Sequence, residues 1–249
     1  MSTERIWPNN SNLQEYLNDF PEHRQRYDLV RSLVKNLKCA DIACGVGYGS
    51  FMMGEVAESV KGFDISNDAL NHANKYFTRD NVSFHHASEF TGEKYDVITS
   101  IETLEHMNEI EGDLFLKNIA NSMNPDSFMI FSTPLNETNN KLNITAFHIR
   151  EYSNSELIDK LKVNGFYVEK WFGQSNIVSE RMSKKVLGLS FVKILQMGLH
   201  KFIPKQVRKY IARIILKKDT LQSKNTCKIK PGDLSGAFSQ IAICRLIKK

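Results

Sequence analysis

Three glycines at alternate positions and one acid downstream are the residues whose spacing points most clearly to chemistry. Gly45, Gly47 and Gly49 follow a short apolar run and precede residues that can open a helix. A glycine turn between a strand and a helix lets a ligand approach the backbone and aims N–H groups at it. Asp64 ends a second apolar run about 20 residues later, where a carboxylate can accept hydrogen bonds from both hydroxyls of a ribose. These features predict a nucleotide-binding α/β domain.

The residues around the glycines indicate which nucleotide. Dinucleotide-binding turns carry Gly-x-Gly-x-x-Gly, whereas this chain has Gly-x-Gly-x-Gly with Asp41 at the preceding strand end. A carboxylate is unfavourable beside a pyrophosphate and favourable beside an ammonium group. The pattern therefore suits S-adenosylmethionine (SAM), which carries a ribose and an α-amino group but no phosphate.

At these residues the chain resembles the class I SAM-dependent methyltransferases. The resemblance continues through residues 81–88, similar to the third strand and its adenine-contacting turn, residues 94–106, similar to the fourth strand and its loop, and residues 128–134, similar to the fifth strand. It implies a single domain over residues 1–249 with an α/β fold, doubly wound around a seven-stranded, mostly parallel, Rossmann-like sheet. The family's last strand runs antiparallel between strands five and six.

A narrower resemblance concerns the acceptor. Five phrases resemble bacterial methyltransferases of surface-polysaccharide (O-antigen type) biosynthesis clusters, namely residues 22–27, 41–50, 101–106, 147–151 and 173–174. This resemblance implies a glycan or glycan-phosphate acceptor. As partner we expect a glycan, a nucleotide-sugar or another small-molecule acceptor.

The methyltransferase resemblance also assigns roles around SAM. Asp41 would reach the methionyl amino group through water or backbone, Gly45 and Gly47 would pass under the donor, and Asp64 would bind the ribose. Ile65 would pack on the adenine and Ser88 would meet its amino edge, although the family more commonly has an acid at or next to that position. Arg26 would bind the methionyl carboxylate; the alternative is an exposed helix charge. The full set of expected cofactor-binding residues is Arg26, Asp41, Ala43, Gly45, Gly47, Asp64, Ile65, Ser88, Ile101 and Glu102.

Two histidines are candidate catalytic bases, His106 in the loop after the fourth strand and His148 after the fifth. A neutral imidazole can take up the proton of a hydroxyl near pH 7, whereas a phosphate oxygen needs no base. For each histidine the alternative is a structural role in its loop. A metal site is conceivable from four residues of suitable type, Glu102, Glu105, His106 and His148. No spacing in the sequence forces their side chains to converge, so we expect no metal.

The expected elements leave a long basic segment unassigned to the sheet. We expect a helix over residues 12–36 that covers the cofactor, strands at 39–44, 58–64, 81–85, 95–100, 127–132, 166–172 and 240–246, helices near 48–56, 67–77 and 109–123, and a helix to residue 163 capped by Ser153. Residues 179–235 are then a helical insertion before the last strand.

The insertion carries an uneven charge. Between Arg181 and Lys230 stand 14 Lys or Arg residues and a single acid, Asp219, a net charge of +13 that leaves −8 on the rest of the chain. The alternatives are a flap packed on the domain, a contact with a partner, and a peripheral attachment to anionic lipid through residues 185–218. Nucleic acid is disfavoured because few aromatic residues interleave the basic ones.

The composition and the cysteine pattern indicate the class of protein and its expected location. The 249 residues are 41% hydrophobic and 24% charged, which is ordinary for a globular domain, and no run reaches the ~18 apolar residues of a membrane span. The four cysteines show no disulfide or metal spacing, and the N-terminus has no apolar signal region. We expect a cytoplasmic protein, or one peripheral on the inner face of the membrane, and predict no oligomeric state.

The combined reading is a SAM-dependent methyltransferase that acts on an oxygen of a sugar or of a glycan-linked phosphate. One alternative is N- or O-methylation of a small metabolite or aminosugar. A second is a catalytically inactive SAM-fold scaffold at the membrane. The presence of Asp41, the glycines and Asp64 disfavours the scaffold.

Overall fold

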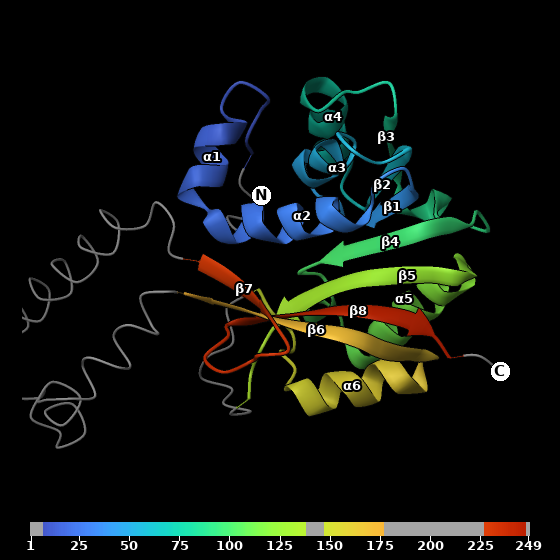
Figure 1. Ribbon diagram of the computed structural model, residues 1–249. Coiled ribbons are helices and arrows are strands. Elements are labelled where there is room, and N and C mark those ends of the chain that lie inside the picture. The colour runs from blue at the N-terminus through green and yellow to red at the C-terminus, as the bar shows by residue number, and fades with distance from the viewer. Residues whose placement is uncertain (1–6, 138–146, 177–226, 248–249) are drawn as a thin grey trace, which may run out of the picture.

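The computed structural model describes residues 7–137, 147–176 and 227–247, which form one eight-stranded sheet between layers of helices (Figure 1). The strand order is β3-β2-β1-β4-β5-β8-β6-β7. The strands are β1 (Lys38–Ile42), β2 (Ser59–Asp64), β3 (Val82–His86), β4 (Tyr95–Ile101), β5 (Met123–Pro134), β6 (Phe166–Asn176), β7 (Cys227–Pro231) and β8 (Ser239–Leu246). The first five pair in parallel, and β8 runs antiparallel between β5 and β6, as expected for the fold class.

Among the described residues, six α-helices and two 3-10 turns precede or connect the strands. They are α1 (Leu13–Asp19), α2 (Pro21–Leu33), α3 (Tyr48–Met53), α4 (Asn67–Tyr76), η1 (Ala87–Glu89), η2 (Leu104–His106), α5 (Glu109–Asn121) and α6 (Asn154–Val163). The expected cap of α6 is confirmed, because the Ser153 side chain accepts from the Glu156 backbone N–H while Glu156 reaches back to Ser153.

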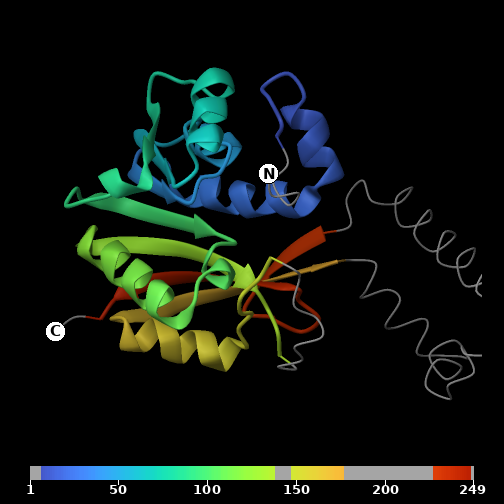
Figure 2. The ribbon, with the colours of Figure 1, turned by 180° about the vertical axis from the view of Figure 1, so that it is seen from behind.

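The sheet buries a hydrophobic core on each face, and successive strand residues alternate between them. Ile98 packs in the core that α5 and α6 cover, whereas its neighbour Val97 packs in the core under α1, α2 and α3. Figure 2 shows α5 and α6 together on one face. This alternation follows from the two-residue period of a strand and explains why the central strands are apolar throughout.

The expected single helix over residues 12–36 is wrong in the structure. Phe20 separates α1 from α2 with φ −120° and ψ 69°, and Pro21 begins α2 at its first position. The residue before a proline is driven out of the helical region, which accounts for the break. The second helix ends at Leu33, and Val34 is its C-cap.

The insertion prediction is corrected at its C-terminal end. Residues 227–231 form β7 rather than a helix, pairing antiparallel with β6 from Asn176↔Cys227 to Phe172↔Pro231. The sheet therefore has eight strands instead of seven, and β7 lies beside α2 (Figure 1). The basic residues 185–218, and the rest of the insertion before residue 227, lie outside the described residues. Within the part of the chain that the structure describes, no helix is long and apolar enough to span a membrane.

Candidate cofactor and acceptor site

The glycine turn joins the carboxyl end of β1 to the start of α3, and two of its glycines serve different purposes. Gly45 and Gly47 both have positive φ, at 59° and 91°. A Cβ added to Gly47 would stand 2.6 Å from the Ala73 Cβ and 2.8 Å from the Phe84 ring, whereas one added to Gly45 would meet no atom within 4 Å. Gly47 is therefore required for packing, whereas the space beside the Cα of Gly45 is open.

Two further positions complete the turn. Gly49 lies inside α3, and a Cβ there would stand 2.0 Å from the Tyr27 ring of α2, so this glycine permits close helix packing and does not face a ligand. Ala43, an expected cofactor residue, holds φ at 59°, which is unusual for a residue with a side chain. Ala43 is therefore a strained position in this turn, and strained positions of this kind cluster at functional sites.

Asp64 ends β2 and braces the glycine turn. One carboxylate oxygen accepts from the Gly45 backbone N–H at 2.8 Å, and the other accepts from Ser66 N–H at 2.9 Å. A carboxylate has about four acceptor positions and can bind several donors at once, and the expected contact of Asp64 with the ribose stays a prediction. The neighbouring Ile65 is 79% exposed, a position from which an apolar side chain can cover a purine. This arrangement fits SAM at the turn.

Asp41 is fully enclosed by the strands and α3. Its two oxygens accept from Ser50 Oγ at 2.7 Å and from Thr99 Oγ1 at 2.8 Å. Burial raises the pKa of this carboxyl to about 6 in spite of those hydrogen bonds. Asp41 thus ties β1 to α3 and β4, and its expected action on the methionyl amino group stays a prediction.

Arg26 of α2 reaches the residue that follows β4. Its guanidinium lies 3.3 Å from the Glu102 carboxylate and donates from Nε to Gln174 Oε1 at 2.7 Å. With only 5% of its surface exposed, Arg26 is not the exposed helix charge considered as its alternative. Gln174 was not among the expected site residues, although its phrase at residues 173–174 belongs to the narrower resemblance.

Glu102 is held in an unusual conformation directly after Ile101, the last residue of β4. Its φ is 51°, and one carboxylate oxygen accepts from Ser132 Oγ at 2.8 Å and from Ser239 Oγ at 3.0 Å. The two serines lie on β5 and β8, so three strands fix this carboxylate at the carboxyl edge of the parallel strands. Ligands collect at that edge in open α/β sheets.

The adenine end of the expected site lies on η1. Ser88 is exposed, and its hydroxyl is 2.8 Å from Nδ1 of His86. His86 pairs in register with Asp64, which places η1 one strand away from the ribose-binding acid. A serine hydroxyl at this place can bind an adenine amino group less strongly than an acid.

The two expected catalytic histidines are brought together. The ring centroids of His106 and His148 lie 5.1 Å apart in an edge-to-face arrangement. Nδ1 of His106 is 3.0 Å from the Phe147 carbonyl, and Nδ1 of His148 is 2.7 Å from the Glu151 carboxylate. Because the two histidines are far apart in the sequence, the sequence did not predict their contact. It depends on residues 147–150, which follow β5 and pack against η2.

Glu105 anchors that loop and was not an expected site residue by itself. Its backbone carbonyl accepts from the N–H groups of Ile149 and Arg150, at 2.7 and 3.1 Å. Its carboxyl is fully buried, and Oε2 accepts from Thr133 Oγ1 at 2.9 Å. Burial, and next the charge of Glu102, hold the pKa of Glu105 well above its usual range. Glu105 stands among polar and charged residues in the sequence, so no local pattern predicts that its side chain is buried.

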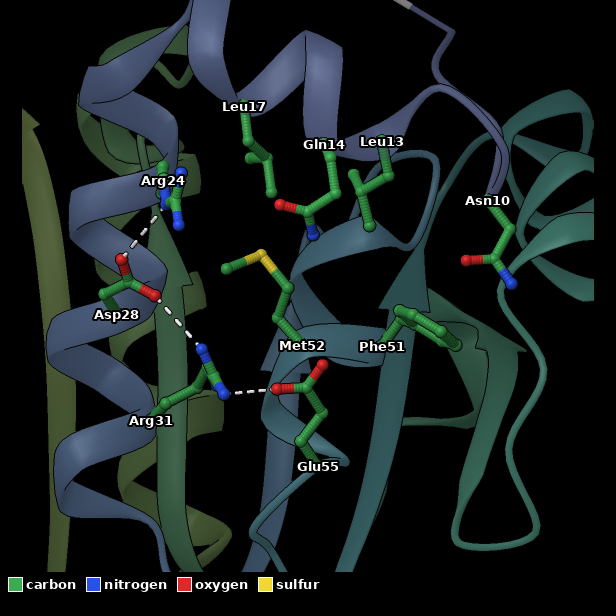
Figure 3. A pocket seen from close by; sticks show the side chains of 10 residues that line it. All are labelled: Asn10, Leu13, Gln14, Leu17, Arg24, Asp28, Arg31, Phe51, Met52 and Glu55. Atoms are coloured by element: carbon green, nitrogen blue, oxygen red, sulfur yellow. Dashed lines mark hydrogen bonds and ion pairs between the residues drawn. The ribbon is translucent and has the colours of Figure 1, made fainter.

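A separate pocket of about 220 Å³ lies between α1, α2 and α3 (Figure 3). Leu13, Leu17 and Met52 face it, and at its rim Arg31 pairs with Asp28 at 3.1 Å and with Glu55. None of the expected cofactor or catalytic residues lines this pocket. It is therefore distinct from the site at the carboxyl edge of the sheet.

Comparison with known proteins decides the family. A family model described as a methyltransferase domain matches residues 10–170, more than half of the chain. The chain belongs to this methyltransferase family. The prediction of a SAM-dependent methyltransferase domain is thereby confirmed at the level of the family.

Curated relatives match over part of their length. A probable S-adenosylmethionine-dependent methyltransferase of Mycolicibacterium smegmatis is 24% identical over 62% of this chain and 61% of the relative. A ubiquinone biosynthesis O-methyltransferase of Pelagibacter ubique is 33% identical over 42% of this chain and 45% of the relative. The chain thus spans less than two-thirds of the length of these relatives.

Solved structures share the fold. A possible histamine N-methyltransferase from Thermotoga maritima matches with a TM-score of 0.58 and 15% identity over 95% of this chain and 97% of that chain. A [4+2]-cyclase matches with a TM-score of 0.57 and 14% identity over 90% of this chain and 82% of that chain. Because both identities are low, these likenesses establish the fold alone. The polysaccharide resemblance stays a prediction.

Proposed function

We propose that this protein transfers a methyl group from SAM to a hydroxyl oxygen of a sugar in polysaccharide biosynthesis. The observation that carries the choice of a hydroxyl is the His106–His148 pair at the edge where Glu102 and Asp64 also lie. A phosphate oxygen is already ionised near pH 7 and would not need these imidazoles, so the site favours a hydroxyl over a glycan-linked phosphate. The sugar itself rests on the narrower sequence resemblance.

In this proposal, separate groups of residues bind SAM and position the acceptor. Bound SAM supplies a methyl group on a positively charged sulfur. Asp64 would bind the ribose beside the open space at Gly45, and Arg26 with Glu102 would border the methionyl side. Holding the acceptor oxygen in line with the methyl can contribute several kcal/mol to the lowering of the barrier.

Proton removal would fall to His148. Its Nδ1 faces the Glu151 carboxylate at 2.7 Å, and Asn136 Nδ2 donates to the other oxygen of Glu151 at 3.3 Å. In a neutral ring Nδ1 donates to the carboxylate, so Nε2 carries the lone pair that accepts the hydroxyl proton. Glu151 then stabilises the imidazolium, while the new O–C bond forms and the S–C bond breaks.

A second candidate is O-methylation of a small metabolite. It is supported by the relatives named for ubiquinone biosynthesis and by two apolar side chains flanking His148, since Phe147 is 43% exposed and Ile149 59% exposed. An apolar or aromatic acceptor would cover these side chains, whereas a sugar would cover only the polar groups between them.

The test is a transfer assay with methyl-labelled SAM and four acceptor classes: a nucleotide-sugar, a glycan phosphate, a catechol and an aminosugar. We expect label on a sugar hydroxyl, and a loss of ~10²-fold or more in kcat for His148→Ala with SAM affinity unchanged. His85→Ala is the matched control, because His85 lies on β3 beside Phe63 and Glu89. Label on the aminosugar nitrogen alone, or equal kcat in both variants, contradicts the proposal.

A further inference from the structure

We propose that Glu105, His106 and His148 bind one divalent transition-metal ion at the acceptor side of the site. One ligand atom from each of the three residues lies within 4.8 Å of the other two. They come from η2 and from the loop after β5, so the fold, and not a local spacing, brings them together. This differs from the absence of a metal expected from the sequence.

The two histidines are arranged as metal ligands commonly are. Nδ1 of His106 faces a backbone carbonyl and Nδ1 of His148 faces a carboxylate. Both partners only accept, so each neutral ring carries its hydrogen on Nδ1 and its lone pair on Nε2. A metal-binding imidazole typically donates its other N–H to such a group, which fixes the ring and strengthens the ligand nitrogen.

Glu105 supplies an independent observation. Its side chain is fully buried, and Oε1 has no hydrogen-bond partner among the described residues, while Oε2 is held by Thr133. A buried polar atom without a partner is costly and calls for an explanation such as an ion. A cation between the carboxylate and the two imidazoles would satisfy Oε1.

The ligand set defines the kind of ion. Two imidazoles and one carboxylate suit Zn²⁺, Co²⁺, Ni²⁺ or Fe²⁺ rather than Ca²⁺ or Mg²⁺, which prefer oxygen ligands. Tetrahedral ligands on Zn²⁺ lie about 3.3 Å apart, so the exposed His106 ring would turn inward on binding. Three protein ligands leave a position open.

The role of the ion rests on the proposed O-methylation, although its binding does not. An acceptor hydroxyl in the open position would lose its proton to solvent more readily, because a bound cation lowers the pKa of a coordinated hydroxyl. In the metal-bound protein the ion would therefore replace His148 Nε2 as the group that activates the acceptor.

The test uses the full chain without a polyhistidine tag, dialysed against a chelator and titrated with CoCl₂. Visible absorption reports Co²⁺ bound to the imidazoles, and calorimetry with ZnCl₂ gives the affinity. We expect one equivalent of either ion, and a loss of at least about 10-fold in affinity in each of His106→Ala, His148→Ala and Glu105→Gln.

His85→Ala is the matched control and should bind the metal as the unchanged protein does. Circular dichroism and melting curves show that each variant is folded. Absence of metal binding by the unchanged protein overturns the proposal, and so does binding by the His106 and His148 variants that is as tight as that of the unchanged protein. SAM calorimetry on the chelated protein is independent of the metal, so a failure there would count against the proposed function and not against this site.

Discussion

Arg26 on α2 and Glu102 after β4 form an ion pair at 3.3 Å that joins the helix covering the sheet to the edge where the cofactor residues gather. Arg26 is 5% exposed, and the Glu102 side chain is 24% exposed. Both residues were expected to bind SAM, Arg26 at the methionyl carboxylate. If the predicted contacts with SAM hold, the cofactor meets a pre-formed pair in which each charge already has a partner.

Removal of the Arg26 guanidinium should therefore lower the stability of the folded protein. Arg26→Met leaves Glu102 beside the buried Glu105 without its cation, and we expect unfolding free energy to fall by about 3 kcal/mol. Arg24→Met is the matched control: its pair with Asp28, at 3.6 Å, is exposed and should contribute no more than about 1 kcal/mol. Urea denaturation measures both, and equal losses would show that the Arg26 pair does not stabilise the fold.

Gly45 and Gly47, the two glycines of the turn with positive φ, should respond differently to substitution by alanine. Gly45→Ala has room for its Cβ and should lose about 1–2 kcal/mol of stability through the left-handed backbone alone. Gly47→Ala adds clashes with Ala73 and Phe84 and should lose clearly more. Conversely, Gly45→Ala should weaken SAM binding although it remains folded, because its Cβ would enter the space above the turn. Melting curves and calorimetry test the pair, and full SAM affinity in Gly45→Ala would argue against that placement.

The buried Asp41 should make stability depend on pH. Its pKa in the folded protein, about 6, exceeds the ordinary pKa of 3.8 for an aspartate, so the folded state binds more protons between these values. The contribution of Asp41 to stability therefore decreases as pH rises from 4 to 6. Relative to Asp41→Asn, the unchanged protein should lose on the order of 2–3 kcal/mol over that window. Denaturation at several pH values measures the difference, and Asp28→Asn, a change at an exposed aspartate, is the control. If the unfolding free energies of the unchanged protein and of Asp41→Asn vary in parallel with pH, the raised pKa is contradicted.

Local sequence predicted the parts of the fold that depend on local chemistry. The glycine turn, the acid at the end of β2 and the Ser153 cap each follow from a short pattern whose physical requirement lies within a few residues. The Pro21 signal was also local, but the apolar period of residues 12–36 runs through it and hides the break at Phe20.

The rest depends on long-range contacts. Strand β7 is short and basic, and it is a strand only because the edge of β6 offers it hydrogen bonds. Burial of Glu105 and the meeting of His106 with His148 require the loop after β5 to return to η2. Gln174 likewise acts on Arg26 across a sequence separation of 148 residues. Single-sequence patterns carry no information about such pairings.

The most direct test of the account is SAM binding by calorimetry, comparing the unchanged protein with Asp64→Ala and with Asp80→Ala. Asp80 is an exposed acid between α4 and β3 and is not one of the expected site residues. Loss of the ribose hydrogen bonds in Asp64→Ala should weaken binding by about 1–3 kcal/mol, with Asp80→Ala unchanged. No SAM binding by the folded, unchanged protein would contradict the methyltransferase account and leave the inactive scaffold as the better explanation.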